Sequence, residues 1–184
     1  MGYTTDFTGQ FNLDKPLTLE QTEYLIKFCR TRHMKRDAVK TNKRPDPLRK
    51  AVGLPIGNEG GYFVNEGGDF GQSQGSDVLD GNKAPSGQPG LWCQWIPGDQ
   101  DGLPYHEGSD EGEDEGATYI VWDGREKFYE YVAWLKYIIE NFLIPWGHNL
   151  NGEVDWEGED FDDLGKIIVK DNIVTTKKAK IVYE

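Results

Sequence analysis

Arginine, tryptophan and histidine side chains that could together bind a phosphorylated ligand occur between residues 30 and 106. Arginine donates paired hydrogen bonds to phosphate oxygens, a tryptophan ring stacks on a base or a sugar, and a histidine moves a proton. An enzyme acting on a phosphorylated or nucleotide substrate would combine all three functions, with His106 or a nearby acid as the proton carrier. The candidate ligand-binding residues are Arg32, Arg36, Arg49, Trp92, Trp95 and His106.

The arginines belong to a basic segment in an acidic chain. Residues 27–50 carry ten Lys or Arg against two acids, whereas residues 51–184 carry nine against twenty-six. Besides a phosphate site, this division is explained by a solvated basic face, or by an internal clamp that holds acidic parts of the chain through charge.

An acidic run provides a second candidate surface, for a protein partner. It lacks the alternation and the fixed glycine of an EF-hand loop, which favours a solvated acidic loop over a calcium site. Such a surface could mimic nucleic acid toward a basic protein. Its residues are Asp110, Glu111, Glu113, Asp114 and Glu115.

No motif in the sequence marks a catalytic centre. The glycine-rich stretch at residues 57–61 lacks the Lys-Ser/Thr of a phosphate-binding loop, and the three histidines have no partner at metal-ligand spacing. We therefore expect no catalytic residue, no metal and no cofactor.

Composition limits the partners and the compartment. A net charge of −12 over 184 residues argues against general affinity for nucleic acid and against an anionic membrane surface. No apolar run approaches the roughly 20 residues that span a bilayer. Cys29 and Cys93 lie far apart, which favours reduced thiols and a cytoplasmic location.

The elements that position these residues follow from periodicity and turn chemistry. Alternation predicts a strand over residues 3–13, in which Gly9 marks a bulge or a close neighbour. Thr18 and Gln21 form a capping box that begins a helix. Residues 118–122 predict another strand, and Asp123 is expected to cap a helix that extends to Phe142. The remaining predicted strands cover 150–156, 167–169 and 173–174, with a hairpin turn at Asp171-Asn172.

This order, β-α-β-β-α-β, predicts an α+β fold of the ferredoxin-like, split βαβ type, with two helices on one face of an antiparallel sheet and a C-terminal hairpin. We expect one domain over residues 1–184. Residues 53–116 hold 16 of the 23 glycines and predict a long, acidic loop insertion. Within it, residues 91–96 predict a short strand that places Trp92 and Trp95 on opposite faces.

Several phrases of the sequence together resemble a group of small bacterial and phage proteins to which no function is attached. The resemblance implies a bacterial or phage setting and supplies no catalytic residues. The phrases include Gly2-Tyr3-Thr4-Thr5, Pro89-Gly90-Leu91-Trp92-Cys93-Gln94-Trp95, Trp122-Asp123-Gly124 and Leu150-Asn151-Gly152-Glu153-Val154.

The leading hypothesis is a non-enzymatic binding protein, a small accessory or inhibitory factor. Its partner would be a host or phage protein, or a nucleotide-like ligand. The alternatives are an enzyme acting on a phosphorylated or nucleotide substrate and a structural subunit that buries its tryptophans in a homodimer interface.

Overall fold

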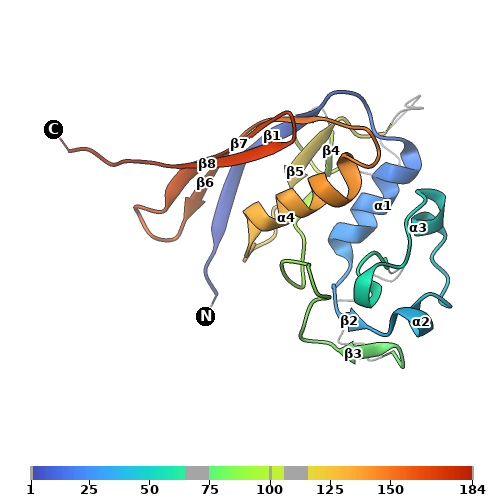
Figure 1. The fold of residues 1–184 in the computed structure, drawn as a ribbon. Coiled ribbons are helices and arrows are strands. Elements are labelled where there is room, and N and C mark those ends of the chain that lie inside the picture. Colours follow the sequence, from blue (N-terminus) through green and yellow to red (C-terminus); the bar gives the residue numbers. More distant parts are fainter. Residues whose placement is uncertain (1, 65–74, 100, 106–115, 184) are drawn as a thin grey trace. The chain divides into compact units, whose positions relative to one another are not determined.

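The computed structural model describes residues 2–64, 75–99, 101–105 and 116–183. The chain divides into two compact units. The sheet unit comprises Met1–Pro16, Gln94–Glu111 and Ala117–Glu184, and the helical unit comprises Leu17–Cys93 and Gly112–Gly116. The fold is mixed α and β, with a six-stranded antiparallel sheet and several short helices (Figure 1).

The sheet unit is built on β1, which lies near the centre of the sheet. The strand order is β4-β5-β1-β6-β7-β8, and every neighbouring pair is antiparallel. The six strands are β1 (Thr5–Leu13), β4 (Trp95–Gly98), β5 (Tyr119–Trp122), β6 (Leu150–Gly158), β7 (Leu164–Lys170) and β8 (Ile173–Lys178).

One face of this sheet is apolar because strand residues alternate between its two sides. On β1, Phe7, Phe11 and Leu13 are buried, whereas Asp6 and Thr8 are exposed. The buried face packs aromatic rings edge to face, as between Phe7 and Trp95 with ring centroids 5.3 Å apart. Figure 1 shows α4 (Tyr131–Ile138) lying along one face of the sheet, and a π-helical turn (η2, Ile139–Leu143) continues it.

The glycine prediction for β1 is confirmed as a close approach of two strands. Gly9 has a φ of +114°, and a Cβ atom there would lie 2.7 Å from the carbonyl oxygen of Glu153 on β6. Only glycine combines that backbone conformation with this spacing.

The hairpin prediction is also confirmed. Asp171 and Asn172 both have positive φ, at 48° and 67°, and they join β7 to β8 through the pair Lys170↔Ile173. Positive φ at both central residues is what a two-residue type I′ turn requires.

The helix predicted to begin at Asp123 is wrong at its start, because α4 begins only at Tyr131. The Asp123 carboxylate accepts a hydrogen bond from the backbone amide of Arg125 and also binds the Arg125 guanidinium, at 2.6 Å to Nη2. Gly124, Lys127 and Glu130 then take positive φ, which interrupts helical geometry until residue 131.

The strand predicted over residues 91–96 is also displaced, since β4 begins at Trp95. Trp92 and Trp95 therefore do not lie on opposite faces of one strand.

The helical unit is organised around α1 (Leu19–Arg30). Its capping box is confirmed: the Thr18 hydroxyl accepts from the Gln21 amide, and the Gln21 side chain accepts from the Thr18 amide. Shorter elements follow in the chain. They are β2 (Lys35–Arg36), α2 (Ala38–Thr41), α3 (Pro47–Ala51), the 3-10 turn η1 (Asn58–Gly60) and β3 (Val78–Asp80), which pairs with β2.

The ferredoxin-like arrangement stays a prediction, because one of its two helices, α1, belongs to the helical unit and its sheet to the sheet unit. The single domain with an insertion over 53–116 likewise stays a prediction. The part of this segment that the structure describes contains η1, β3 and β4 between irregular stretches.

Candidate functional site

Arg36 is buried in the helical unit and belongs to a network centred on Asp77. Its Nη1 donates to the Asp77 carboxylate at 2.8 Å, and the side chains are 4% and 6% exposed. The Thr41 hydroxyl donates to the same carboxylate, and Arg44 approaches it at 3.3 Å. The Arg36 and Arg44 guanidinium carbons each lie 4.7 Å from the centre of the Phe63 ring.

Burial and hydrogen bonding have opposite effects on the pKa of Asp77. Burial raises the pKa of Asp77, but the hydrogen bonds from Thr41 and Arg36 outweigh it, and the pKa lies below its ordinary value. Asp77 is therefore ionised near neutral pH and compensates the buried Arg36.

Arg49 forms a second, separate network. Its Nε donates to Asp46 at 3.0 Å, Nη1 donates to the Leu54 carbonyl, and Nη2 donates to the Asn42 side chain. Asp46 and Arg49 are both 3% exposed. The guanidinium therefore makes a hydrogen bond within the fold at each of its three nitrogens.

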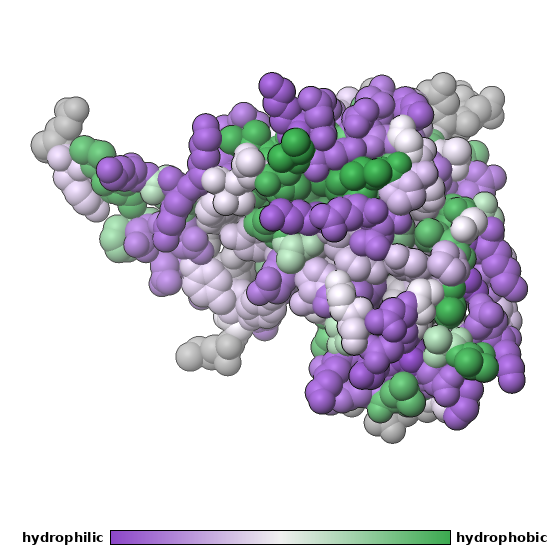
Figure 2. Space-filling model, in the orientation of Figure 1, coloured by the Kyte–Doolittle hydropathy of each residue, from purple (hydrophilic) through white to green (hydrophobic). Residues whose placement is uncertain are grey.

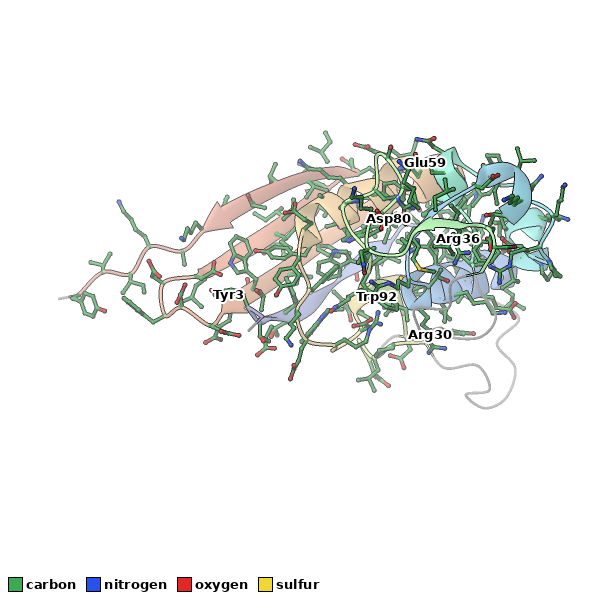
Figure 3. The ribbon with its side chains drawn as sticks, turned by 90° about the horizontal axis from the view of Figure 1, so that it is seen from below. Tyr3, Arg30, Arg36, Glu59, Asp80 and Trp92 are labelled. Carbon is green, nitrogen blue, oxygen red and sulfur yellow. The ribbon has the colours of Figure 1, made fainter. Side chains whose placement is uncertain are left out.

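Arg32 and Trp92 lie together at a third place in the helical unit. Both are half-buried, and the Arg32 guanidinium lies 5.9 Å from the centre of the Trp92 ring. Arg32 also donates to the Gly81 carbonyl and to the Asn82 side chain. Figure 3 shows Trp92 apart from Arg36. The contacts of Arg32, Arg36 and Arg49 are with different partners, so the three predicted arginines do not converge on one ligand site.

Two further predicted groups can be placed only in part. Trp95 belongs to the sheet unit, where it is fully buried and its indole N–H donates to the Tyr131 carbonyl at 2.7 Å. His106 and the acidic residues Asp110, Glu111, Glu113, Asp114 and Glu115 lie outside the described residues.

The two described histidines are buried. Desolvation lowers the pKa of His33 to about 3, and its Nε2 lies 2.9 Å from the Phe28 carbonyl. Desolvation also lowers the pKa of His148. Among residues 2–64, 75–99, 101–105 and 116–183, no group of three or more His, Cys, Asp or Glu is placed to hold a metal ion. Within the same ranges, no helix is long and apolar enough to cross a membrane.

Sequence reasoning missed a groove of about 560 Å³ in the sheet unit. It lies on strands β1, β6, β7 and β8, mainly on the side opposite the buried aromatic residues. We call it the outer-face groove. Leu164 and Ile168 supply apolar surface, and charged residues of both signs surround them: Asp6, Glu153, Asp155, Glu157, Lys166, Lys177 and Lys178.

Strand register fixes which of these charges are neighbours. Lys166 on β7 lies opposite Asp155, and its ammonium group is 2.7 Å from the Glu153 carboxylate and 3.7 Å from Asp155. The hydrogen bond between Lys166 and Glu153 lowers the pKa of Glu153 and raises that of Lys166. Both groups are therefore charged at neutral pH.

Two other neighbouring pairs carry like charges. Asp6 on β1 lies directly opposite Glu157 on β6, and both are exposed. Lys166 lies directly opposite Lys177 on β8. Like charges opposite one another on antiparallel strands destabilise a sheet. The groove thus has an acidic end at Asp6 and Glu157 and a basic side at Lys166 and Lys177.

The alternating acids of residues 153–157 and the single lysine, Lys166, within residues 164–168 are visible in the sequence. Their juxtaposition with Asp6 and Lys177 required the strand order, which periodicity does not specify. Comparison of the chain with models of protein families, with curated proteins and with solved structures finds no match.

Proposed function

We propose that this protein is a non-enzymatic binding factor, a small accessory or inhibitory protein of a bacterium or phage, acting on a partner protein in the cytoplasm. The outer-face groove is its binding surface. The groove combines apolar surface at Leu164 and Ile168 with charges of both signs, a composition suited to recognising a polypeptide.

The observation that carries this proposal is the exposed pair Asp6 and Glu157 inside the groove. Two carboxylates opposite one another cost stability, and no ion pair to either is found within the described ranges. A lysine or arginine side chain of a partner would neutralise both. The groove therefore favours a partner segment that places a basic residue at this end and an acidic residue near Lys177.

Catalysis has weaker support. The buried, neutral His33 and His148 are poorly placed to exchange protons with a substrate in solution, and Arg36 and Arg49 are engaged by buried carboxylates. A phosphate would have to displace Asp77 or Asp46 from these arginines.

Affinity capture with charge-reversed variants tests the proposal. Glu157→Lys reverses a charge in the groove, and Asp162→Lys makes the same change at an exposed acid of the sheet unit that does not line it. We expect quantitative mass spectrometry of bacterial lysate to identify a protein retained by wild type and Asp162→Lys and reduced at least tenfold with Glu157→Lys. Equal retention by all three proteins contradicts the proposal.

A nucleotide-like ligand at Arg32 and Trp92 is the second candidate function. It is favoured by the guanidinium that lies over a half-buried tryptophan ring, because arginine binds phosphate and a tryptophan ring can stack on a base. Native mass spectrometry of protein purified gently from bacterial cells tests it. A stoichiometric adduct that is lost in Arg32→Ala supports this function, and a bare mass counts against it.

A further inference from the structure

The strand β8 ends the sheet, and among the residues that the structure describes only β7 pairs with it. Five of its six residues are exposed. The phase of the pairing is set by the hydrogen bond from the Ala179 amide to the Leu164 carbonyl. Backbone hydrogen bonds in an antiparallel pair alternate. Residues 173, 175 and 177 therefore bond to β7, and Val174, Thr176 and Lys178 direct their amide and carbonyl groups away from the sheet.

The opposite edge of the sheet is different, because the chain itself covers β4. The Tyr105 amide donates to the Pro97 carbonyl at 2.9 Å, and Gly98 forms a bridge with Pro104. Pro97 also has no amide to offer another strand. Within the described part of the chain, β8 is the sheet edge whose outward donors and acceptors, in regular alternation, take no backbone partner.

Charge identifies what would pair with this edge. Residues 164–180, which form the β7–β8 hairpin and its continuation, contain five lysines and one acid, in a chain with a net charge of −12. Lys177 and Lys178 lie on β8, and Lys180 follows it. Figure 2 shows hydrophilic side chains interleaved with hydrophobic ones along this part of the chain, where Ile173 is 68% exposed.

We propose that β8 is a docking strand, to which an extended acidic segment of a partner protein adds as a seventh antiparallel or parallel strand. This inference deepens the proposed function, on which it rests, by naming the class of segment bound. The backbone edge offers donors and acceptors alternately, which matches a polypeptide, whereas phosphate groups of a nucleic acid only accept. Successive residues of a strand point to opposite faces of the sheet, so carboxylates of the segment would face Lys177 on one face or Lys178 on the other.

The same lysines disfavour pairing of β8 with a second copy of itself, since edge lysines are a common protection against self-association. An acidic strand removes that repulsion. The lysines of this edge therefore disfavour a second copy of β8 and favour an acidic strand.

A labelled peptide and a proline variant test the docking strand. The probe is a fluorescein-labelled peptide of sequence Glu-Thr-Glu-Val-Glu-Thr-Glu-Val, measured by fluorescence anisotropy against the full chain. Thr176→Pro removes an outward amide that takes no part in the β7–β8 pairing, and proline is tolerated at such edge positions. Thr176→Val keeps the amide and serves as the matched control.

We expect Thr176→Pro to weaken peptide binding at least tenfold and Thr176→Val to change it less than twofold. A peptide N-methylated at alternate residues, with its charge unchanged, should also bind wild type at least tenfold more weakly. This second arm leaves the protein unaltered, so it remains decisive if Thr176→Pro perturbs folding. Equal binding of both peptides, or no binding of the unmodified peptide, overturns the docking strand. A different result contradicts the proposed function itself: equal capture of lysate proteins by Glu157→Lys and by wild type.

Discussion

The Arg36 guanidinium and the Asp77 carboxylate form an ion pair 2.8 Å long with both side chains buried, although the residues are 41 positions apart. Asp77 also receives a hydrogen bond from Thr41 and lies near Arg44. The sequence of the basic segment suggests a phosphate-binding site. In the structure, Arg36 of this segment instead joins β2 to the turn before β3. This network links β2, α2 and the turn before β3.

Removing the carboxylate charge from this pair should destabilise the protein strongly. Asp77→Asn leaves a buried guanidinium uncompensated, and breaking a buried pair from one side costs about 3–5 kcal/mol. Urea unfolding followed by circular dichroism measures the loss. Lys83→Met removes a 3.6 Å pair in which the lysine is 76% exposed, and it should cost less than about 0.5 kcal/mol. Similar losses for the two variants would show that the Arg36–Asp77 pair is not structural.

Alanine substitutions at two glycines with positive φ distinguish the stability cost of backbone strain from the cost of a steric clash. Gly53→Ala, at φ +72° with no heavy atom within 4 Å of the added Cβ, should cost about 1–2 kcal/mol. Gly9→Ala adds a clash with the Glu153 carbonyl and should cost more than about 3 kcal/mol. Thermal unfolding compares them, and equal melting temperatures would contradict the close approach of β1 and β6.

Acid should destabilise the fold through His33. Its folded pKa of about 3 lies below the ordinary 6.5, so the unfolded chain takes up the proton first. The stability associated with the neutral ring is complete above pH 6.5 and is lost as the pH falls toward 3, by about 1.4 kcal/mol per pH unit.

Urea unfolding at several pH values between 4.5 and 6.5 measures that dependence. His33→Gln removes the titrating ring, and the free energy of unfolding of this variant should fall less steeply with acid than that of wild type. Parallel curves would show that His33 is not buried in its neutral form.

Charge reversal in the groove should raise stability while it lowers binding. Glu157→Lys converts the repulsion opposite Asp6 into an attraction, which is worth about 0.5 kcal/mol. Asp162→Lys has no such cross-strand partner on β1 and should leave the unfolding free energy nearly unchanged. If Glu157→Lys is less stable than wild type, the two carboxylates are not neighbours and the groove lacks the acidic end that the proposed binding requires.

Local signals predicted local structure well. The capping box at Thr18 and Gln21 and the turn at Asp171-Asn172 act within a few residues, so the sequence contains everything they need. The helix cap predicted at Asp123 is wrong because an aspartate side chain can either cap a helix or close a turn. Here Arg125, two residues later, binds the Asp123 carboxylate and stabilises the turn.

The candidate site depends on contacts between residues in different elements, and local sequence patterns do not predict such contacts. Arg36 is occupied by Asp77 and Arg49 by Asp46, and whether an arginine meets a ligand or a buried carboxylate depends on the tertiary fold. The groove likewise forms only when β1, β6, β7 and β8 become neighbours. Strand periodicity predicted the individual strands but not that order.

Site-specific photo-crosslinking tests whether the outer-face groove contacts a partner protein. A photoreactive amino acid replaces Thr8, an exposed groove residue, and in a control protein it replaces Val39 in the helical unit, which is 71% exposed. After irradiation in bacterial lysate, we predict a discrete crosslinked species from position 8 that is absent from position 39 and lost when Glu157→Lys is added. Crosslinking that is the same from both positions, or unaffected by Glu157→Lys, would contradict a binding function of the outer-face groove.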